Sequence, residues 1–197
     1  MDLKASETYI LGQLSQNLPP TLYYHGVMHT LDVTKVAMQL AEAEGITDPT
    51  ELCLLHTAAL YHDAGFLVTY QEHEAASCQV ARNVLPQFGY TSEAVEAICA
   101  IIMATRVPQA PATRLQQILC DADLDYLGRK DFPQIARMLF KEWHVRHFVD
   151  TEENWNQVQI RFMENHHYWT PTAKQWRQAG KEEHLRQLQE QLGGALG

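Results

Sequence analysis

Residues 59–66 read ALYHDAGF and place a histidine, His62, directly before an aspartate, Asp63. An apolar run, LCLLHTAALY, leads into this pair over residues 52–61 and is typical of a buried helix. At the end of such a helix both side chains can reach one metal ion, since imidazole nitrogen and carboxylate oxygen suit Mn, Fe, Zn, Ni or Mg. Asp63 can also bridge two metal ions. Because a carboxylate is unfavourable at a helix C-terminus, we expect a cation beside it.

The composition of the chain excludes several classes of protein. With 197 residues, the chain is long enough for one domain with a sizeable core, or for a core domain with a helical extension. A net charge of −9 argues against a protein that binds nucleic-acid polymers or anionic membranes through charge alone. A small anionic substrate remains compatible with this charge if a metal ion supplies local positive charge.

The N-terminus, the apolar runs and the cysteines together indicate a cytoplasmic protein. Residues 1–10 lack a basic region followed by an apolar core, so we expect no signal peptide. No apolar run approaches the roughly 20 residues that a membrane span requires. The four cysteines lie far apart without a CxxC pair, which predicts free, buried thiols in a reducing compartment.

Apolar residues recur with helical spacing along nearly the whole chain, and no segment alternates as a β-strand does. Prolines and glycines separate the segments, because proline cannot fit inside a helix and glycine favours its end. The expected helices cover residues 5–17, 28–44, Asp48-Pro49-Thr50 to His62-Asp63, 72–88, 93–105 with Ser92 as N-cap, 113–127, 131–147, 152–168 and 171–192. The sequence therefore predicts an all-α fold.

A second group of polar side chains lies upstream, in the segment YHGVMHTLDV of residues 24–33. On a helix, His29 lies one turn before the apolar Val33 and therefore faces the core, whereas His25 lies where the loop meets the helix. A single histidine on an apolar face is more often a hydrogen-bonded core residue than a ligand. His25 can likewise be a polar residue at a helix start with no catalytic role.

Residues 121–125, DADLD, hold three aspartates in five positions. The apolar stripe of the expected helix runs through Leu115, Ile118, Leu119, Ala122 and Tyr126. Asp123 and Asp125 border that stripe, whereas Asp121 points largely away from it. Three carboxylates this close repel one another unless a cation intervenes, so the segment is either part of a metal site or a solvated acidic surface.

Further polar side chains follow the His62-Asp63 pair. His73 begins the segment HEAAS at the start of an expected helix, where it can bind a second metal ion, contact a substrate phosphate or cap the helix. Arg106 ends the segment IIMATR, and its planar guanidinium suits a phosphate group, although exposed arginines are often only solvated. His56 falls on the same helical face as Asp63, where we expect a supporting or core role.

The order of these residues resembles that of the HD-domain superfamily of metal-dependent phosphohydrolases, through His29, His62-Asp63 and Asp123. The segment around His29 is also similar to the first metal-binding motif of the cyclic-nucleotide phosphodiesterase branch, Tyr-His-Asn-x-x-His-Ala-x-Asp-Val. The chain departs from that motif at Gly26 and Thr30. The resemblance implies an HD-domain helical bundle with additional C-terminal helices.

For the domain organisation, the resemblance implies a single HD-type domain over residues 1–197. Its motif core covers residues 23–127, and residues 128–197 form a C-terminal helical extension.

The resemblance also implies a role for each polar residue. His29, His62, Asp63 and Asp123 would hold the metal, the last because Ala122-Asp123-Leu124 matches the family's setting for its final ligand. His25 would protonate the leaving group, Asp63 would take part in catalysis, and His73 and Arg106 would contact the phosphate. Two-metal relatives often carry a further histidine near the position of Arg106, so we expect one metal ion here and leave a second one open.

The function that follows from the resemblance is metal-dependent hydrolysis of a phosphate monoester or phosphodiester, with a nucleotide-like substrate. The cofactor would be a divalent ion, either Mn, Fe, Ni, Co, Zn or Mg. The alternatives are a di-iron oxygenase of the same fold and a non-catalytic nucleotide-sensing module. We expect a small-molecule phosphoester as partner, no nucleic-acid polymer and no membrane, and we leave a homo-oligomer open.

Overall fold

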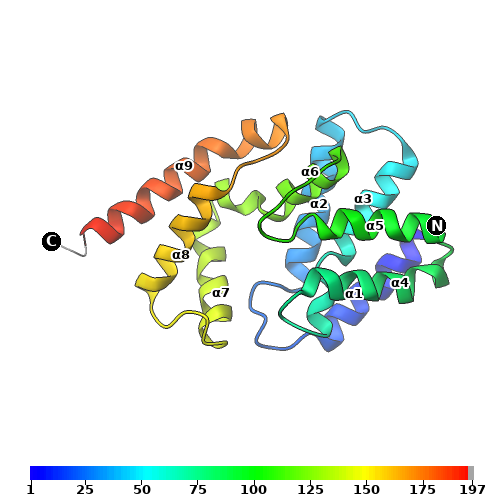
Figure 1. Ribbon diagram of the computed structural model, residues 1–197, viewed down its shortest axis with the longest axis horizontal. Helices are drawn as coiled ribbons and strands as arrows, with labels where there is room; N and C mark the ends of the chain where they lie inside the picture. Colours follow the sequence, from blue (N-terminus) through cyan, green and yellow to red (C-terminus); the bar gives the residue numbers. More distant parts are fainter. Residues whose placement is uncertain (195–197) are drawn as a thin grey trace. The chain divides into compact units, whose positions relative to one another are not determined.

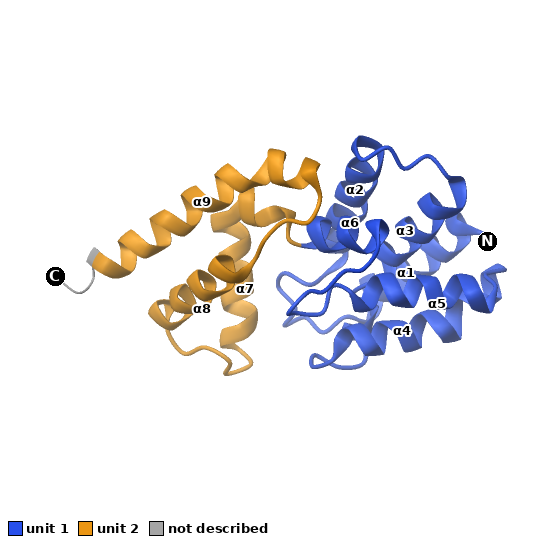
Figure 2. Ribbon diagram, turned by 45° about the horizontal axis from the view of Figure 1, so that its top comes forward, with its two compact units in different colours: residues 1–123 blue, residues 124–197 orange. Residues whose placement is uncertain are grey.

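The computed structural model describes residues 1–194, and its regular secondary structure over that range is entirely helical (Figure 1). The all-α prediction is therefore confirmed. The chain divides into two compact units, residues 1–123 and residues 124–197, the second of which is described as far as residue 194 (Figure 2). The prediction of one domain over residues 1–197 stays a prediction.

The first unit is built around a central helix, α3. Its helices are α1 (Leu3–Asn17), α2 (Val27–Ala43), α3 (Pro49–Tyr61), α4 (His73–Val84), α5 (Ser92–Met103) and α6 (Arg114–Asp123), with the short 3-10 helices η1 (Ala64–Leu67) and η2 (Leu85–Phe88). Each of the other five α-helices of this unit packs against α3. Leu55, Ala58 and Leu60 are fully buried, which explains why this segment reads as apolar on all sides.

Local chemistry fixes both ends of α3. At its start, the Asp48 carboxylate accepts hydrogen bonds from the backbone N–H groups of Thr50 and Glu51, and Pro49 occupies the first turn. At its end, the chain leaves the α-helix after Tyr61 and continues through His62 and Asp63 into η1. The His62-Asp63 pair therefore lies at the buried end of the central helix.

The second unit consists of a 3-10 helix and three α-helices, namely η3 (Asp125–Gly128), α7 (Phe132–His144), α8 (Glu152–Asn165) and α9 (Pro171–Gly194). The helix η3 lies directly against α9, because Gly128 and Gly180 lack side chains at the contact. A Cβ atom on Gly180 would lie 2.2 Å from the carbonyl oxygen of Gly128. Asp125 of η3 also accepts a hydrogen bond of 2.6 Å from Arg177 of α9.

Several predicted helix boundaries were wrong in detail, and the helices expected to end at residues 147 and 168 end at His144 and Asn165. The expected helix over residues 72–88 divides into α4 and η2, because Pro86 has no backbone N–H to continue an α-helix. The expected helix over residues 113–127 divides at Leu124 into α6 and η3. Thr91 caps α5 by accepting a hydrogen bond from the Ala94 N–H, so Ser92 is the first helical residue and not the N-cap.

The expectations about membranes and thiols can be compared with the described residues. Among the helices of residues 1–194, none is both long enough and apolar enough to cross a membrane. The four cysteines are free, as predicted, and Cys78, Cys99 and Cys120 are buried while Cys53 is partly exposed.

Gly65 allows α4 to lie directly against the segment that follows His62 and Asp63. A Cβ atom on Gly65 would lie 1.9 Å from the carbonyl oxygen of His73 and 2.8 Å from the backbone nitrogen of Ser77. Both neighbours are backbone atoms, so neither can rotate away.

We therefore predict that Gly65→Ala destabilises the protein by about 1–3 kcal/mol, because α4 must move to admit the methyl group. Urea denaturation of the metal-free protein measures the change. Gly12→Ala is the matched control, since a Cβ at Gly12 of α1 meets no atom within 4 Å. That control should be neutral or slightly stabilising. Equal stability of the two variants would contradict the prediction.

His166, which follows α8, is a partly exposed histidine whose two ring nitrogens are buried without a hydrogen-bond partner. Its ring packs edge-on against Tyr168, with the ring centroids 4.7 Å apart. Burial, together with the positive charge of Lys181, lowers the pKa of His166 to about 3. In the unfolded chain a histidine titrates near 6.5. Between these two values the unfolded state binds more protons, so stability rises with pH across this window.

This difference predicts that His166 contributes stability above about pH 6.5 that is lost progressively as the pH falls towards 3. The variant His166→Phe keeps the ring packing and removes the titration. Its stability relative to the wild type should therefore increase by about 2 kcal/mol between about pH 7 and about pH 5. Denaturant unfolding at a series of pH values measures this change, and a variant whose stability falls in parallel with the wild type would contradict it.

Candidate metal centre

Two histidines from neighbouring helices face each other in the first unit. His29 lies in the first turn of α2, and His62 follows the last residue of α3. The Nε2 atoms of the two rings are 3.3 Å apart, and the side chains are only 2% and 1% exposed. The packing of α2 on α3 therefore brings together two imidazoles that are 33 residues apart in the sequence.

Hydrogen bonds fix the orientation of His62. Its Nδ1 atom lies 2.7 Å from the carbonyl oxygen of Ala59, and a carbonyl oxygen can only accept, so Nδ1 carries a proton. In the neutral ring this leaves a lone pair on Nε2, directed at His29. The Ser77 hydroxyl donates to the His62 carbonyl oxygen at 2.6 Å and accepts from the Gly65 N–H at 2.7 Å. Backbone and ring are thus both held.

Two carboxylates complete the cluster. Asp63 Oδ2 lies 3.4 Å from the Nε2 atoms of both histidines. Asp123 Oδ1, from the end of α6, lies 3.2 Å from Nε2 of His29 and 3.6 Å from Nε2 of His62. The buried Oδ2 atom of Asp63 has no hydrogen-bond partner, so its lone pairs are available to a cation. His29, His62 and Asp123 offer ligand atoms that all lie within 4.8 Å of one another.

The electrostatics of the cluster require positive charge. Burial lowers the pKa of His29, but the Asp123 and Asp63 carboxylates outweigh this effect and raise that pKa to about 10. Burial raises the pKa values of Asp63 and Asp123, but the neighbouring histidines outweigh it and hold both pKa values well below their usual range. An ionised carboxylate on the buried Asp63 and another on the partly exposed Asp123 are stable here only beside a cation, either imidazolium or a metal ion. The donor set and its charge fit a divalent metal.

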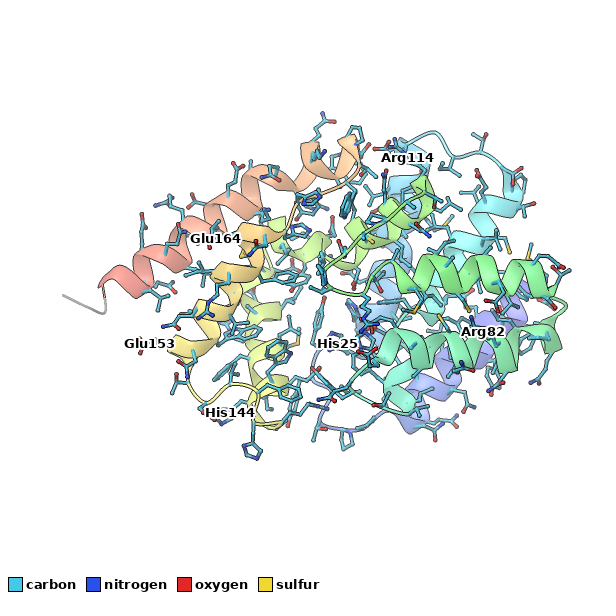
Figure 3. The ribbon with its side chains drawn as sticks, in the orientation of Figure 1. His25, Arg82, Arg114, His144, Glu153 and Glu164 are labelled. Atoms are coloured by element: carbon cyan, nitrogen blue, oxygen red, sulfur yellow. The ribbon has the colours of Figure 1, made fainter. Side chains whose placement is uncertain are left out.

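His25 lies at the junction before α2, as the sequence predicted, and its side chain is labelled in Figure 3. Its ring centroid is 5.6 Å from that of His29 and 6.4 Å from that of His73. Phe66 of η1 packs against His25 with a centroid distance of 4.7 Å. The imidazole of His25 is therefore next to the candidate metal ligands, but it is not one of the side chains whose ligand atoms converge.

His73, the first residue of α4, approaches Asp63 from the other side. Its Nε2 atom lies 3.4 Å from Asp63 Oδ1, whereas Asp63 Oδ2 faces the two buried histidines. Burial lowers the pKa of His73, but Asp63 outweighs this and raises it. The ring stacks on Phe66 at a centroid distance of 4.2 Å with an interplanar angle of 14°. Asp63 therefore links His73 to the cluster.

Other residues singled out from the sequence are not among the converging ligand atoms. Arg106 forms an exposed ion pair of 2.7 Å with Glu72, the residue before His73. Asp125 is engaged by Arg177, and Asp121 is buried although periodicity suggested that it points away from the apolar stripe. The electrostatic neighbour of the half-buried His56 is Glu7 of α1, so its expected place as a support of the site stays a prediction.

Sequence reasoning missed two supporting residues. Ser77 carries the hydroxyl that bridges His62 and Gly65, and Phe66 provides the ring between His25 and His73. Both residues stand within segments that the sequence singled out, ALYHDAGF and HEAAS. A usable signal was the position of Ser77 one helical turn after His73, which places both on the same face of α4.

Comparisons with known proteins agree with this geometry. The family model described as the HD domain matches residues 26–125. An uncharacterized protein of Clostridium beijerinckii is 28% identical over 85 residues, which cover 42% of this chain and 53% of that relative, so the match spans about half of its length. A crystal structure of a Lactobacillus plantarum protein, a structural genomics target, matches with a TM-score of 0.69 at 22% identity. It covers 98% of this chain and 97% of that one, and shows the fold alone.

The geometry predicts which of the neighbouring aspartates binds metal. Asp123→Asn should weaken the affinity for Mn²⁺ or Zn²⁺ by at least about tenfold, because an amide oxygen carries no negative charge. Asp125→Asn is the control, because the carboxylate of Asp125 is engaged by Arg177. Its metal affinity should match that of the wild type. Titration calorimetry measures both values, and an equal loss in the two variants would contradict the choice of Asp123.

Proposed function

The chain belongs to the HD-domain family, and from that premise we propose that it is a metal-dependent phosphohydrolase acting on a nucleotide-like phosphate monoester or phosphodiester. One observation carries the proposal: the ligand atoms of His29, His62 and Asp123 lie close enough together to bind a single ion. The orphaned Oδ2 atom of Asp63 beside them supports the same conclusion.

The proposed metal site is formed by His29, His62, Asp63 and Asp123. A divalent cation held there would polarise a phosphoryl oxygen and would lower the pKa of a water molecule bound to it. The protein residues keep the donor atoms in place, since His62 is hydrogen bonded through Nδ1 and its backbone is held by Ser77. Such supporting hydrogen bonds fix the tautomer and the orientation of a ligand. Asp63 additionally extends its Oδ1 atom towards His73.

His25 is our candidate for the general acid. An imidazole can deliver a proton to a leaving-group oxygen as the bond to phosphorus breaks. The ring packs against Tyr24, at a centroid distance of 5.0 Å, and against Phe66 on another side. These contacts restrict the orientation of the ring beside the cluster, which general acid catalysis requires.

His73 and Arg106 are our candidates for phosphate binding. His73 faces Asp63 and keeps part of its surface exposed, with 24% of the side chain accessible. Arg106 can offer several N–H donors in one plane, which match the oxygens of a phosphate. It is held at Glu72, directly before His73, and therefore within a short reach of the same place.

The decisive experiment is the release of phosphate or product from a panel of mono-, di-, tri- and cyclic nucleotides in the presence of Mn²⁺, Mg²⁺, Ni²⁺ or Co²⁺. We expect turnover by the wild type and a loss of about 100-fold or more in Asp63→Asn, because a charged donor of the metal site is removed. Asp150→Asn, which changes an exposed aspartate of the second unit, is the matched control and should be fully active.

Other results would point elsewhere. Full activity in a folded Asp63→Asn protein would refute the proposed mechanism. Bound iron with substrate-dependent oxygen uptake and no phosphate release would indicate an oxygenase. Tight nucleotide binding without turnover under every metal would indicate a sensing module.

A further inference from the structure

The ion pair between Glu72 and Arg106 joins the start of α4 to the residues just after α5. The two helices lie side by side (Figure 1). Arg106 Nη2 lies 2.7 Å from Glu72 Oε1, and the side chains are 50% and 61% exposed. The next residue after Glu72 is His73, whose Nε2 atom lies 3.4 Å from Asp63. Glu72 is thus the chain neighbour of a residue that contacts the cluster.

The backbone of Glu72 shows that this position is not an ordinary helix start. Glu72 has φ +56° and ψ +34°, the left-handed conformation that residues with side chains rarely adopt. The side chain makes no capping hydrogen bond to α4, although it stands at the N-cap. Its carboxylate instead accepts a hydrogen bond from the guanidinium of Arg106. A backbone conformation of this kind persists where the surroundings hold it, and such positions cluster at functional sites.

An exposed ion pair is easily exchanged. Pairs of this kind contribute little net free energy, since water screens both charges. A phosphate group carries more charge than a carboxylate and offers more oxygens to a guanidinium, so it can compete successfully for Arg106. The carboxylate of Glu72 therefore forms an ion pair with Arg106 that the phosphate group of a substrate can displace.

A second ion pair on the same two helices shows the contrast. Arg82 of α4 donates two hydrogen bonds, both 2.7 Å long, to the two carboxylate oxygens of Glu96 of α5. Arg82 lies well apart from His25 in the view of Figure 3. The Arg82–Glu96 pair ties the helices together with both oxygens, whereas the hydrogen bond from Arg106 reaches one oxygen of Glu72. The Arg106–Glu72 pair is therefore the less constrained of the two ion pairs.

We propose that Glu72 is a positioning residue that holds the guanidinium of Arg106 beside the metal cluster until a substrate phosphate displaces it. One anion replaces another at Arg106, with no covalent step. Glu72 thereby holds Arg106 near the site before the substrate binds. At the same time it competes with phosphate for Arg106 and so weakens phosphate binding. The inference rests on the proposed function, because it takes the ligand of Arg106 to be a phosphate group.

The test measures the binding of inorganic phosphate to protein loaded with one equivalent of Mn²⁺ and freed of excess metal. Titration calorimetry compares the wild type, Glu72→Gln, Arg106→Gln and the double variant. Glu72→Gln should bind phosphate about two- to fivefold more tightly, because the competitor is removed. Arg106→Gln should bind it more weakly. In the double variant the substitution of Glu72 should have no further effect, which shows that Glu72 acts through Arg106.

Glu96→Gln is the matched control, because it removes the carboxylate from the other α4–α5 ion pair and should leave the phosphate affinity unchanged. Thermal unfolding of each variant separates a structural role, which would shift the melting temperature but not the phosphate affinity. Three results would overturn the inference: unchanged or weaker binding in Glu72→Gln, an equal gain in the Arg106→Gln background, or no phosphate binding by any variant. Turnover by the wild type that is lost in Asp63→Asn would leave the proposed function standing in each case.

Discussion

The Ser77 hydroxyl makes the contact on which the metal centre depends, because it donates to the His62 carbonyl oxygen and accepts from the Gly65 N–H. These two hydrogen bonds satisfy backbone groups that the end of α3 leaves unpaired in a buried place, where unpaired polar groups are costly. They also attach α4 to the segment that carries His62 and Asp63. The contact requires a residue without a side chain at Gly65, since a Cβ there would overlap the backbone of α4. The position of the ligands is therefore set by backbone packing.

Two kinds of cation can balance the charges of the cluster. Desolvation acts against charge on His29, His62, Asp63 and Asp123, yet the carboxylates and imidazoles together outweigh it. In the metal-free protein a proton on an imidazole balances the carboxylates, and a divalent cation can take its place with more charge and a better fit to the lone pairs. A buried set of this composition is unfavourable if either kind of cation is withheld. The cluster in the core of the first unit therefore needs a cation in the folded protein.

Much of this site could be predicted from the sequence because its residues stand at helix ends and on apolar stripes. The spacing of His29 to Val33 placed that imidazole towards the core, and the apolar run before His62 marked the central helix of the first unit. The choice of Asp123 came from a family resemblance, because periodicity alone did not separate it from Asp125. The partners of Arg106 and Ser77 could not be predicted, since they depend on how α4 packs against α5 and η1. Contacts between elements distant in sequence leave no periodic signal.

The division between buried ligands and an exposed rim determines how this site can change. His29, His62 and Asp63 are nearly inaccessible, so substituting any of them changes the charge balance of the core as well as the metal affinity. Arg106 and Glu72 are half exposed, and substitutions at such positions usually alter stability only slightly. Under the proposed function, residues at the rim can therefore adjust the affinity for different anionic groups without disturbing the cluster. Such a site would keep one chemistry fixed while a few exposed side chains set its substrate preference, so the candidate ligands are easier to recognise in the sequence than a substrate.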